Sequence, residues 1–204
     1  MGFLKQIINA EIDMFIKSEL RNEYRLIRRS LDDSFCEGAS KKICESIIGL
    51  SEYGSSKTIM SYSAINKEVR TDLLNEHALN SQKTLLLPVC NTKTETMHAA
   101  RLNGAQDMAL GGYGIYEPSD KTAFDEEKID IVIVPALVFN RRGYRIGYGK
   151  GYYDKFLCSS KNALKIGCAY ACQISDMDFC SDYDIAVDII VTQKEVIYCH
   201  DKSI

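Results

Sequence analysis

The stretch that decides the fold covers residues 131–156 and reads IVIVPALVFNRRGYRIGYGKGYYDKF. It opens with an unbroken run of β-branched residues, 131–134, which is typical of a strand buried on both faces of a parallel sheet. Pro135 lacks an N–H group, so we expect it to end the strand. From Tyr152 onward the residues predict a first helical turn. The stretch therefore predicts a strand, a loop and the start of a helix.

The loop inside this stretch is rich in glycine and in positive charge. Four of the chain's 13 glycines fall within nine residues, at Gly143, Gly147, Gly149 and Gly151. Such density favours positive φ angles and close approach of backbone N–H groups to an anion. The helix start adds free N–H groups and a positive dipole end. Four cations surround the loop, namely Arg141, Arg142, Arg145 and Lys150. Together these features predict a phosphate-binding loop.

Asp154 is the one anion inside this basic stretch. A carboxylate beside bound phosphates is a natural ligand of Mg²⁺, so we expect Asp154 to bind the metal ion. The spacing fits neither Walker A, because Gly151 follows Lys150, nor the dinucleotide fingerprint, which needs one more residue between glycines. A glycine-rich surface loop with solvated arginines is the alternative interpretation.

The run from Val134 to Phe156 resembles the signature of the 5-formyltetrahydrofolate cyclo-ligase family, V-P-G-[LV]-x-F-[DN]-x-x-G-x-R-[LI]-G-x-G-x-G-Y-Y-D. This chain has Ala136 where the family commonly has Gly, and Asn140 where Asp is common. The resemblance implies an ATP- and Mg²⁺-dependent enzyme. Its expected reaction converts 5-formyltetrahydrofolate to 5,10-methenyltetrahydrofolate, with phosphorylation of the formyl oxygen, ring closure and release of ADP and phosphate.

Residues 12–31 show apolar positions at three- and four-residue spacing, which predicts an amphipathic helix. A basic row accompanies the apolar stripe at Lys17, Arg21, Arg25 and Arg29. Like charges at that spacing repel, so the row indicates either an anion site or a solvated basic face. The resemblance implies that Lys17 and Arg21 contact the phosphates of ATP.

Further elements follow in alternation along the chain. We expect a turn-like linker at 32–39, a helix at 40–50, and strands at 57–62, 83–89 (ended at Pro88), 97–102, 164–170, 186–192 and 195–199. Such alternation predicts a three-layer α/β/α fold, with a largely parallel open sheet and helices on both faces, in a single domain covering residues 1–204. Loops after Tyr62, Val134 and Tyr170 should converge on one cleft at the carboxyl ends of the strands.

Two acidic positions outside the glycine-rich loop bear on the site. The resemblance implies that Glu68 and Ser63 line the folate site, although Glu68 alone would read as an exposed acid near a helix start. Asp188 lies within an apolar run, where an unpaired carboxylate is costly. The resemblance associates Asp188 with the magnesium site, and the alternative is an aspartate that caps a neighbouring loop.

The expected site residues follow from these motifs and the resemblance. ATP is expected at Lys17, Arg21, Arg145, Ile146, Gly147, Tyr148, Gly149, Lys150, Gly151, Tyr152 and Tyr153. The folate is expected at Ser63, Glu68, Tyr148, Gly149, Lys150, Gly151 and Tyr152, where the flat ring of Tyr152 would form a wall beside it. The catalytic residues would be Lys150, Arg145 and Tyr152, and Mg²⁺ would bind Asp154 and Asp188.

Composition narrows the remaining possibilities. The net charge of −3 and the pI near 5.7 argue against nucleic acid as a partner. With no long apolar run and no signal-peptide pattern, we expect a cytoplasmic protein without a membrane partner, as a monomer or weak homodimer. The eight cysteines contain no C-x-x-C pair, so we expect reduced, mostly buried thiols. Two alternatives stay open: another anion-binding α/β enzyme, such as a sugar-phosphate isomerase or CoA transferase, and a non-enzymatic nucleotide- or nucleic-acid-binding module.

Overall fold

The computed structural model describes residues 2–181 and 184–199, and for residues 2–11 and 105 only the backbone. Its centre is a seven-stranded sheet in the order β12-β11-β9-β6-β1-β2-β3. The strands are β1 (Thr58–Met60), β2 (Thr84–Asn91), β3 (Thr96–Arg101), β6 (Ile131–Pro135), β9 (Leu164–Cys168), β11 (Ile189–Val191) and β12 (Val196–Tyr198). The five inner strands are parallel, and β3 and β12 are antiparallel edges. The predicted α/β fold with a largely parallel sheet is confirmed.

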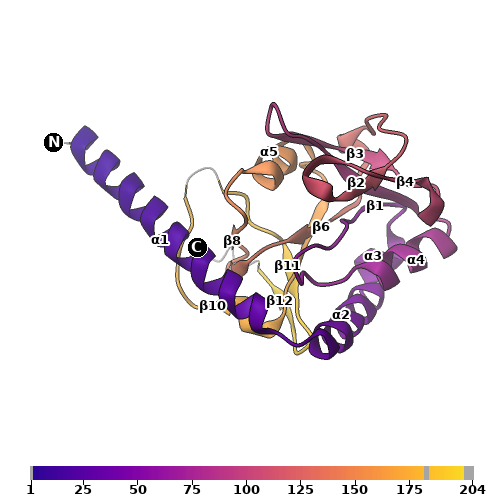
Figure 1. The fold of residues 1–204 in the computed structure, drawn as a ribbon, viewed down its shortest axis with the longest axis horizontal. Coiled ribbons are helices and arrows are strands. Elements are labelled where there is room, and N and C mark those ends of the chain that lie inside the picture. The colour runs from indigo at the N-terminus through magenta and orange to yellow at the C-terminus, as the bar shows by residue number, and fades with distance from the viewer. Residues whose placement is uncertain (1, 182–183, 200–204) are drawn as a thin grey trace.

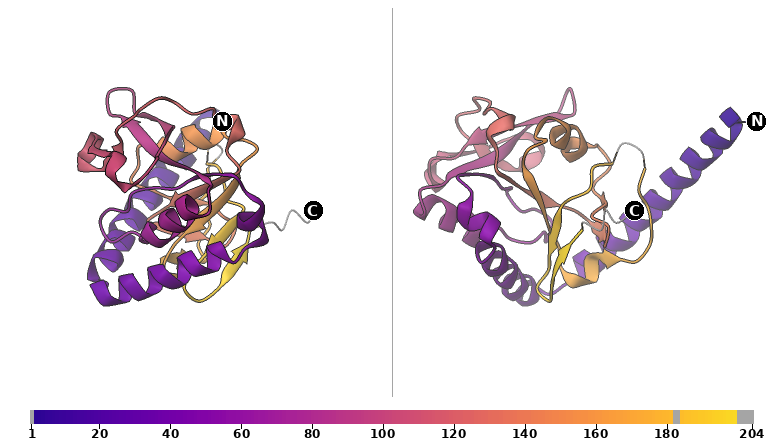
Figure 2. Two further views of the ribbon diagram at one scale, coloured as in Figure 1. Left: turned by 90° about the vertical axis from the view of Figure 1, so that its right-hand side faces the viewer. Right: turned by 180° about the vertical axis from the view of Figure 1, so that it is seen from behind.

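Helices cover both faces of this sheet, as Figures 1 and 2 show. The helices α2 (Asp33–Ile48), α3 (Ser51–Ser55) and α4 (Asp72–Asn80) lie on one face, and α5 (Tyr152–Ser159) lies on the other. The central strand β6 explains the arrangement, because Ile131 and Ile133 pack with α2 and α4 whereas Val132 and Val134 pack with α5. The β-branched run is therefore buried on both faces, as predicted.

The first helix, α1 (Gly2–Ser30), extends away from the body at its N-terminal end (Figure 1). Its C-terminal half buries Leu20 and Tyr24 against Leu137 and against Val138 and Ile146 of a smaller sheet. That sheet has the order β10-β7-β8 and consists of β7 (Val138–Asn140), β8 (Arg145–Ile146) and β10 (Ile174–Ser175). A hairpin of β4 (Met108–Leu110) and β5 (Tyr116–Pro118) stands beside β2. The basic row of α1 is thereby brought beside the glycine-rich loop, which follows β8 directly.

Two expectations about local structure were wrong. Residues 33–39 are helical rather than a linker, because Cys36 and Ala39 are buried and extend the apolar face of α2. The strand at β2 continues through Pro88, which pairs with Ala99 of β3. Pro88 lies past Leu86, the last residue that pairs with β1, so its missing N–H removes no bond to that strand.

The cysteines also differ in part from the expectation. All eight are free thiols, but only Cys36, Cys44 and Cys168 are buried, and Cys158 and Cys172 are exposed. Burial raises the pKa of the Cys44 thiol to about 11, as expected of an inert core cysteine. Within the part of the chain that the structure describes, no helix has the length and apolar character needed to cross a membrane.

Candidate active site

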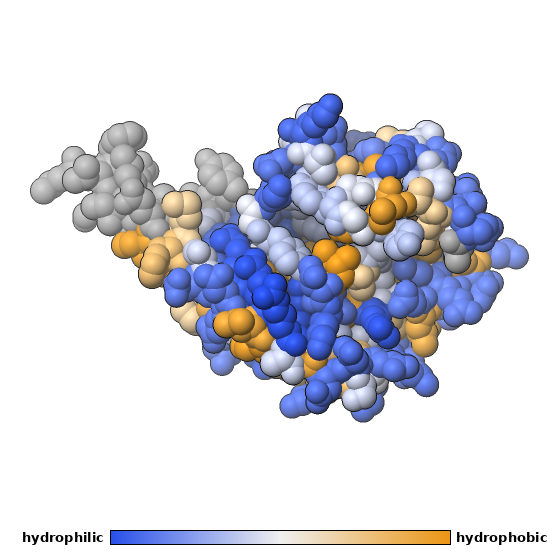
Figure 3. All heavy atoms as spheres, viewed as in Figure 1, coloured by the Kyte–Doolittle hydropathy of each residue, from blue (hydrophilic) through white to orange (hydrophobic). Residues whose placement is uncertain are grey.

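A large pocket opens where the strand order of the main sheet reverses. From β1 the chain continues to β2 and β3 on one side, then returns to β6 on the other side of β1. In open α/β sheets, ligands bind in the crevice at the carboxyl ends of the strands at such a switch point. The pocket here has a volume of about 580 Å³ and is lined by Tyr62 and Ser63 after β1 and by Pro135 and Ala136 at the end of β6. Figure 3 shows hydrophilic side chains along α1 bordering the hollowed middle of this face.

The glycine-rich loop forms one wall of the pocket, from Arg145 to Asp154. Gly149 has φ +101° and Gly151 has φ +67°, which side chains other than glycine rarely adopt. Gly151 directly precedes α5, whose eight residues begin at Tyr152. The sequence therefore aims the first N–H groups of α5 at the pocket wall, where they favour an anion.

Two cations of α1 line the same pocket as this loop. The Arg21 Nε donates a hydrogen bond to the Gly147 carbonyl oxygen at 3.1 Å, and the Lys17 ammonium pairs with Asp184. Burial and the neighbouring Arg25 lower the pKa of Arg21, and Asp184 opposes that effect. Both side chains line the pocket, so the basic row contributes positive charge to it at Lys17 and Arg21.

Lys150, in the glycine-rich loop, lies at the solvent-exposed rim of the pocket. Its Nζ donates to the Tyr113 hydroxyl at 2.8 Å and is 3.3 Å from the Glu95 carboxylate. These hydrogen bonds raise the pKa of Lys150, so it stays a cation. The Tyr113 hydroxyl also lies 2.9 Å from the Tyr152 hydroxyl, which places the two rings edge to face across the mouth of the pocket.

Arg145 differs from the other cations because it is buried, with only 7% of its surface exposed. Its Nη2 contacts the Asp154 Oδ1 at 2.7 Å, and its Nη1 donates to the Ile185 carbonyl oxygen at 2.6 Å. Burial lowers the pKa of Arg145, and the charge of Asp154 opposes that shift. The pair sits in the pocket wall, where Arg145 fixes one oxygen of Asp154.

The far side of the pocket comes from the loop between β1 and α4. Ser63 donates to the Tyr116 carbonyl oxygen at 2.8 Å, which ties this loop to β5. Glu68 is 6% exposed, and its Oε2 accepts from the Ile65 N–H at 3.1 Å. The position of Glu68 in the pocket wall excludes the interpretation as a solvated surface acid.

Tyr153 supplies an unusual polar group. Its hydroxyl is buried and, among the described residues, has no hydrogen-bond partner. Burial raises the pKa of Tyr153 well above its ordinary value, so the hydroxyl stays protonated. Because a buried hydroxyl without a partner is costly, its position in the pocket lining points to a polar atom of a bound ligand.

The structure brings together all but one of the residues expected from the sequence. Every expected ATP and folate residue lines the pocket, and so does Asp154. Asp188 does not line it. That residue precedes β11 at its amino end, where its Oδ2 accepts from the Lys165 N–H at 2.7 Å. The structure therefore does not join Asp154 and Asp188 in one metal site, and no cluster of three or more ligand side chains exists within 2–181 and 184–199.

Sequence reasoning missed two charged residues near the pocket. Asp184 lines it, but its local sequence carries no motif, and only the fold brings it to Lys17. Arg28 lies behind the pocket wall and is 2% exposed. Its seven-residue separation from Arg21, two helical turns along α1, was a signal that it shares the same side of the helix.

Comparison with known proteins agrees with the fold. Residues 13–193 match the model of the 5-formyltetrahydrofolate cyclo-ligase family. The Aquifex aeolicus 5,10-methenyltetrahydrofolate synthetase superposes with a TM-score of 0.82 at 32% identity, covering 93% of this chain and 95% of that one. The Mycoplasma pneumoniae 5,10-methenyltetrahydrofolate synthetase gives 0.72 at 26% identity, covering 87% and 98%. A probable 5-formyltetrahydrofolate cyclo-ligase of Schizosaccharomyces pombe is 28% identical, covering 87% of this chain and 97% of its own length. The chain therefore belongs to the 5-formyltetrahydrofolate cyclo-ligase family.

Proposed function

We propose that the pocket at the switch point is the active site of the cyclo-ligase reaction, and that one domain, residues 1–204, carries it. As a family member, the chain converts 5-formyltetrahydrofolate to 5,10-methenyltetrahydrofolate, and the family uses ATP. One observation carries the assignment to this pocket. The glycine-rich loop and its cations, which are suited to binding phosphate, line the same cavity as Ser63 and Glu68. Family membership decides against the isomerase, CoA-transferase and non-enzymatic alternatives.

The phosphates of ATP would lie along the glycine-rich loop. The N–H groups around Gly149 and Gly151, together with Lys17, Arg21 and Lys150, provide donors and positive charge there. Lys17 now pairs with Asp184 and would exchange that partner for a phosphate. Phosphoryl transfer depends mainly on such positioning and charge neutralisation, so no covalent nucleophile is needed.

The reduced folate would occupy the side formed by Ser63, Glu68 and Tyr152. The ring of Tyr152 offers a flat apolar face, and the Glu68 carboxylate accepts hydrogen bonds. The unpartnered Tyr153 hydroxyl lies in the lining of the same cavity and is available to either substrate. This arrangement would place the formyl group beside the γ-phosphoryl group.

The chemistry then proceeds in two steps. The formyl oxygen attacks the γ-phosphorus of ATP and ADP leaves, which converts a poor leaving group into a phosphate ester. The neighbouring anilino nitrogen attacks the formyl carbon, the five-membered ring closes, and inorganic phosphate leaves. Lys150 would stabilise charge on the transferring phosphoryl oxygens, since its ammonium stands at the rim of the phosphate side.

Magnesium fits the residues present. Among the described residues, Arg145 and the Ile185 N–H both donate to Asp154 Oδ1, so neither of these hydrogen bonds uses Oδ2. Mg²⁺ bound with phosphates commonly uses only one or two carboxylates, and Asp154 and Asp184 both line this pocket. We therefore assign Asp154 as the protein ligand, with Asp184 as a second candidate in place of Asp188. When bound, Mg²⁺ neutralises phosphate charge.

Replacing Asp154 with Asn tests this assignment. The amide keeps the size and one oxygen but loses the charge, so the Mg²⁺ concentration for half-maximal turnover should rise at least about tenfold. The Asp176→Asn variant is the matched control, because Asp176 is 95% exposed, pairs with Arg141 at the surface and does not line the pocket. Identical magnesium titrations for Asp154→Asn and the control would remove Asp154 from the metal site.

The coupling of ATP to the folate tests the function itself. ADP and phosphate should each appear in a one-to-one ratio with the methenyl product, and neither should accumulate when 5-formyltetrahydrofolate is left out. The rival enzyme classes do not hydrolyse ATP. ATP cleavage at the same rate with and without the folate would contradict the proposed mechanism.

A further inference from the structure

Arg28, near the end of α1, is a buried cation that the mechanism above does not use. Its Nη1 donates to the Ala136 carbonyl oxygen at 3.2 Å, and its Nη2 donates to the Tyr148 hydroxyl. Its Nη1 is also 3.7 Å from the Glu68 Oε1. One guanidinium thus connects α1 with the end of β6, the glycine-rich loop and the loop before α4.

These contacts have one feature in common. Ala136, Tyr148 and Glu68 all line the active-site pocket, whereas Arg28 lies behind them and does not. A buried arginine is costly unless its charge is paired and its donors are used, and an apolar side chain would usually fill such a place better. The contacts of Arg28 therefore indicate a role in arranging the pocket wall rather than in filling the core.

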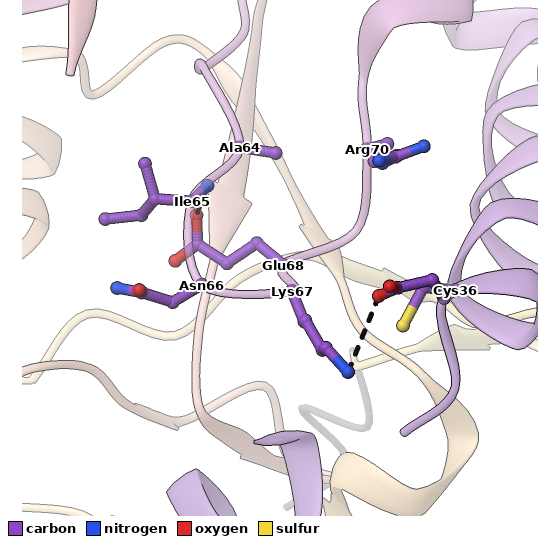
Figure 4. A pocket seen from close by; sticks show the side chains of 8 residues that line it. Cys36, Ala64, Ile65, Asn66, Lys67, Glu68 and Arg70 are labelled. Carbon is purple, nitrogen blue, oxygen red and sulfur yellow. Dashed lines mark hydrogen bonds and ion pairs between the residues drawn. The ribbon is translucent and has the colours of Figure 1, made fainter. Parts of the chain in front are cut away.

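The loop that carries Glu68 is held from two sides. Asn66 and Lys67 have φ angles of 48° and 59°, in the left-handed region that non-glycine residues rarely adopt. Figure 4 shows the Glu68 carboxylate turned back toward Ile65, whereas Lys67 runs the other way to an ion pair with Asp33 at the start of α2. Lys67 also donates to the Leu31 carbonyl oxygen, just after α1. A second, smaller cavity lies on the other side of this loop, between it and the start of α2. Glu68 lines both this cavity and the main pocket, so the turn places it in the wall that separates them.

Several ionisable groups face Glu68, from every element packed around it. They are Arg28 on α1, Tyr148 in the glycine-rich loop, Tyr62 after β1, Tyr153 on α5, and Tyr170 after β9, whose hydroxyl donates to the Glu68 carbonyl oxygen at 3.1 Å. Burial raises the pKa of Glu68, and the charge of Arg28 is the largest effect that opposes this. Arg28 is the one cation in that set. Without it, the carboxyl would remain protonated to a higher pH.

We propose that Arg28 is a positioning residue for the folate substrate, which holds Glu68 as an ionised acceptor beside Tyr148. In that state the carboxylate can accept hydrogen bonds from N–H donors of the reduced pterin ring, which a protonated carboxyl does less well. The inference rests on the proposed function of this pocket. It assigns to Arg28 no contact with either substrate.

Steady-state kinetics of Arg28→Met, Arg28→Lys and Glu68→Gln test the proposal. Arg29→Met is the matched control, since Arg29 neighbours Arg28 on α1 but is exposed and does not line the pocket. Arg28→Met should raise the KM for 5-formyltetrahydrofolate at least about tenfold, with a much smaller change in the KM for ATP. In the pH profile of kcat/KM for the folate, the acid limb should move to higher pH, because the Glu68 carboxyl then loses its proton at a higher pH. Arg28→Lys, which keeps the charge, should recover part of both effects.

A double variant supplies the decisive comparison. If Arg28 acts through Glu68, then Arg28→Met added to Glu68→Gln should cost little beyond Glu68→Gln alone. An unmoved acid limb and unchanged folate KM in Arg28→Met would overturn the proposal, and so would full additivity in the double variant. Should Arg28→Met fail to fold, Glu68→Gln decides instead, since an acid limb and a folate KM identical to those of wild type in that variant would overturn the proposal. Wild-type enzyme run in parallel separates the two claims, because its failure to form product would instead defeat the proposed function.

Discussion

Lys150→Ala should lower kcat/KM at least about tenfold while leaving the thermal midpoint of unfolding unchanged. The loss of about 1.4 kcal/mol of transition-state stabilisation is enough for a tenfold effect, and a cation beside transferring phosphoryl oxygens typically supplies that much. Stability should not change, because the Lys150 side chain is nearly half exposed and its contacts, with Tyr113 and Glu95, lie at the surface. Turnover assays and a melting curve on the same sample give both quantities.

Lys155→Ala is the control for this variant. Lys155 also reaches the Glu95 region, where its Nζ donates to the Glu95 carbonyl oxygen at 2.9 Å, but it does not line the pocket. We expect wild-type kcat/KM for Lys155→Ala. Equal activities for Lys150→Ala, Lys155→Ala and wild type would show that the rim cation has no part in the reaction.

Arg145→Ala should lower both activity and stability. The side chain is buried and makes an ion pair with Asp154 and a hydrogen bond to the Ile185 carbonyl oxygen, so its removal takes away the cation beside Asp154 and the donor to Ile185. Breaking a fully buried pair costs roughly 3–5 kcal/mol, and the partial exposure of Asp154 reduces this to about 2 kcal/mol. For a chain of this length the thermal midpoint should fall by roughly 4–8 °C.

Arg145→Lys separates the two effects. Lysine retains the charge but lacks the planar fork that reaches Asp154 and Ile185 together, so stability should recover only in part. Turnover of Arg145→Ala, measured well below its unfolding transition, should still be at least about tenfold below wild type. A fully active Arg145→Ala with a wild-type melting curve would mean that neither role applies.

Lys150 and Arg145 also illustrate which structural properties can be predicted from sequence alone and which cannot. From the motif alone, Lys150 and Arg145 look equivalent, since both are cations of the glycine-rich loop. The structure separates them, because β8 directs Arg145 inward while Lys150 stands on the rim. Burial depends on how the small sheet packs under α1, and no local pattern encodes that packing.

Local patterns predicted the elements of the main sheet well. The β-branched run of β6 and the glycine-rich loop ahead of α5 carry strong local signals, and the order of elements restricts the fold to a parallel α/β sheet. The pocket follows from that topology, since the loops after β1 and β6 must meet at the switch point. This is why the expected ATP and folate residues lie together.

The features of the site that the sequence did not predict depend on contacts between residues that are far apart in the chain. The resemblance associated Asp188 with the metal, whereas the structure places Asp188 outside the pocket lining, where its carboxylate accepts from the Lys165 N–H at the amino end of β9. Asp184, four residues earlier, reaches the pocket without any sequence signal. Glu68 and Arg28 meet although 40 positions separate them in the chain, which only the packing of α1 against the body explains.

The central claim, that this pocket performs ATP-dependent cyclisation of 5-formyltetrahydrofolate, is tested most directly by absorbance in the methenyl-folate band. The protein is mixed with 5-formyltetrahydrofolate, ATP and Mg²⁺, and a parallel sample omits ATP. Absorbance should rise in the complete mixture and should not rise without ATP. A folded protein that binds ATP but produces no rise would contradict the assignment.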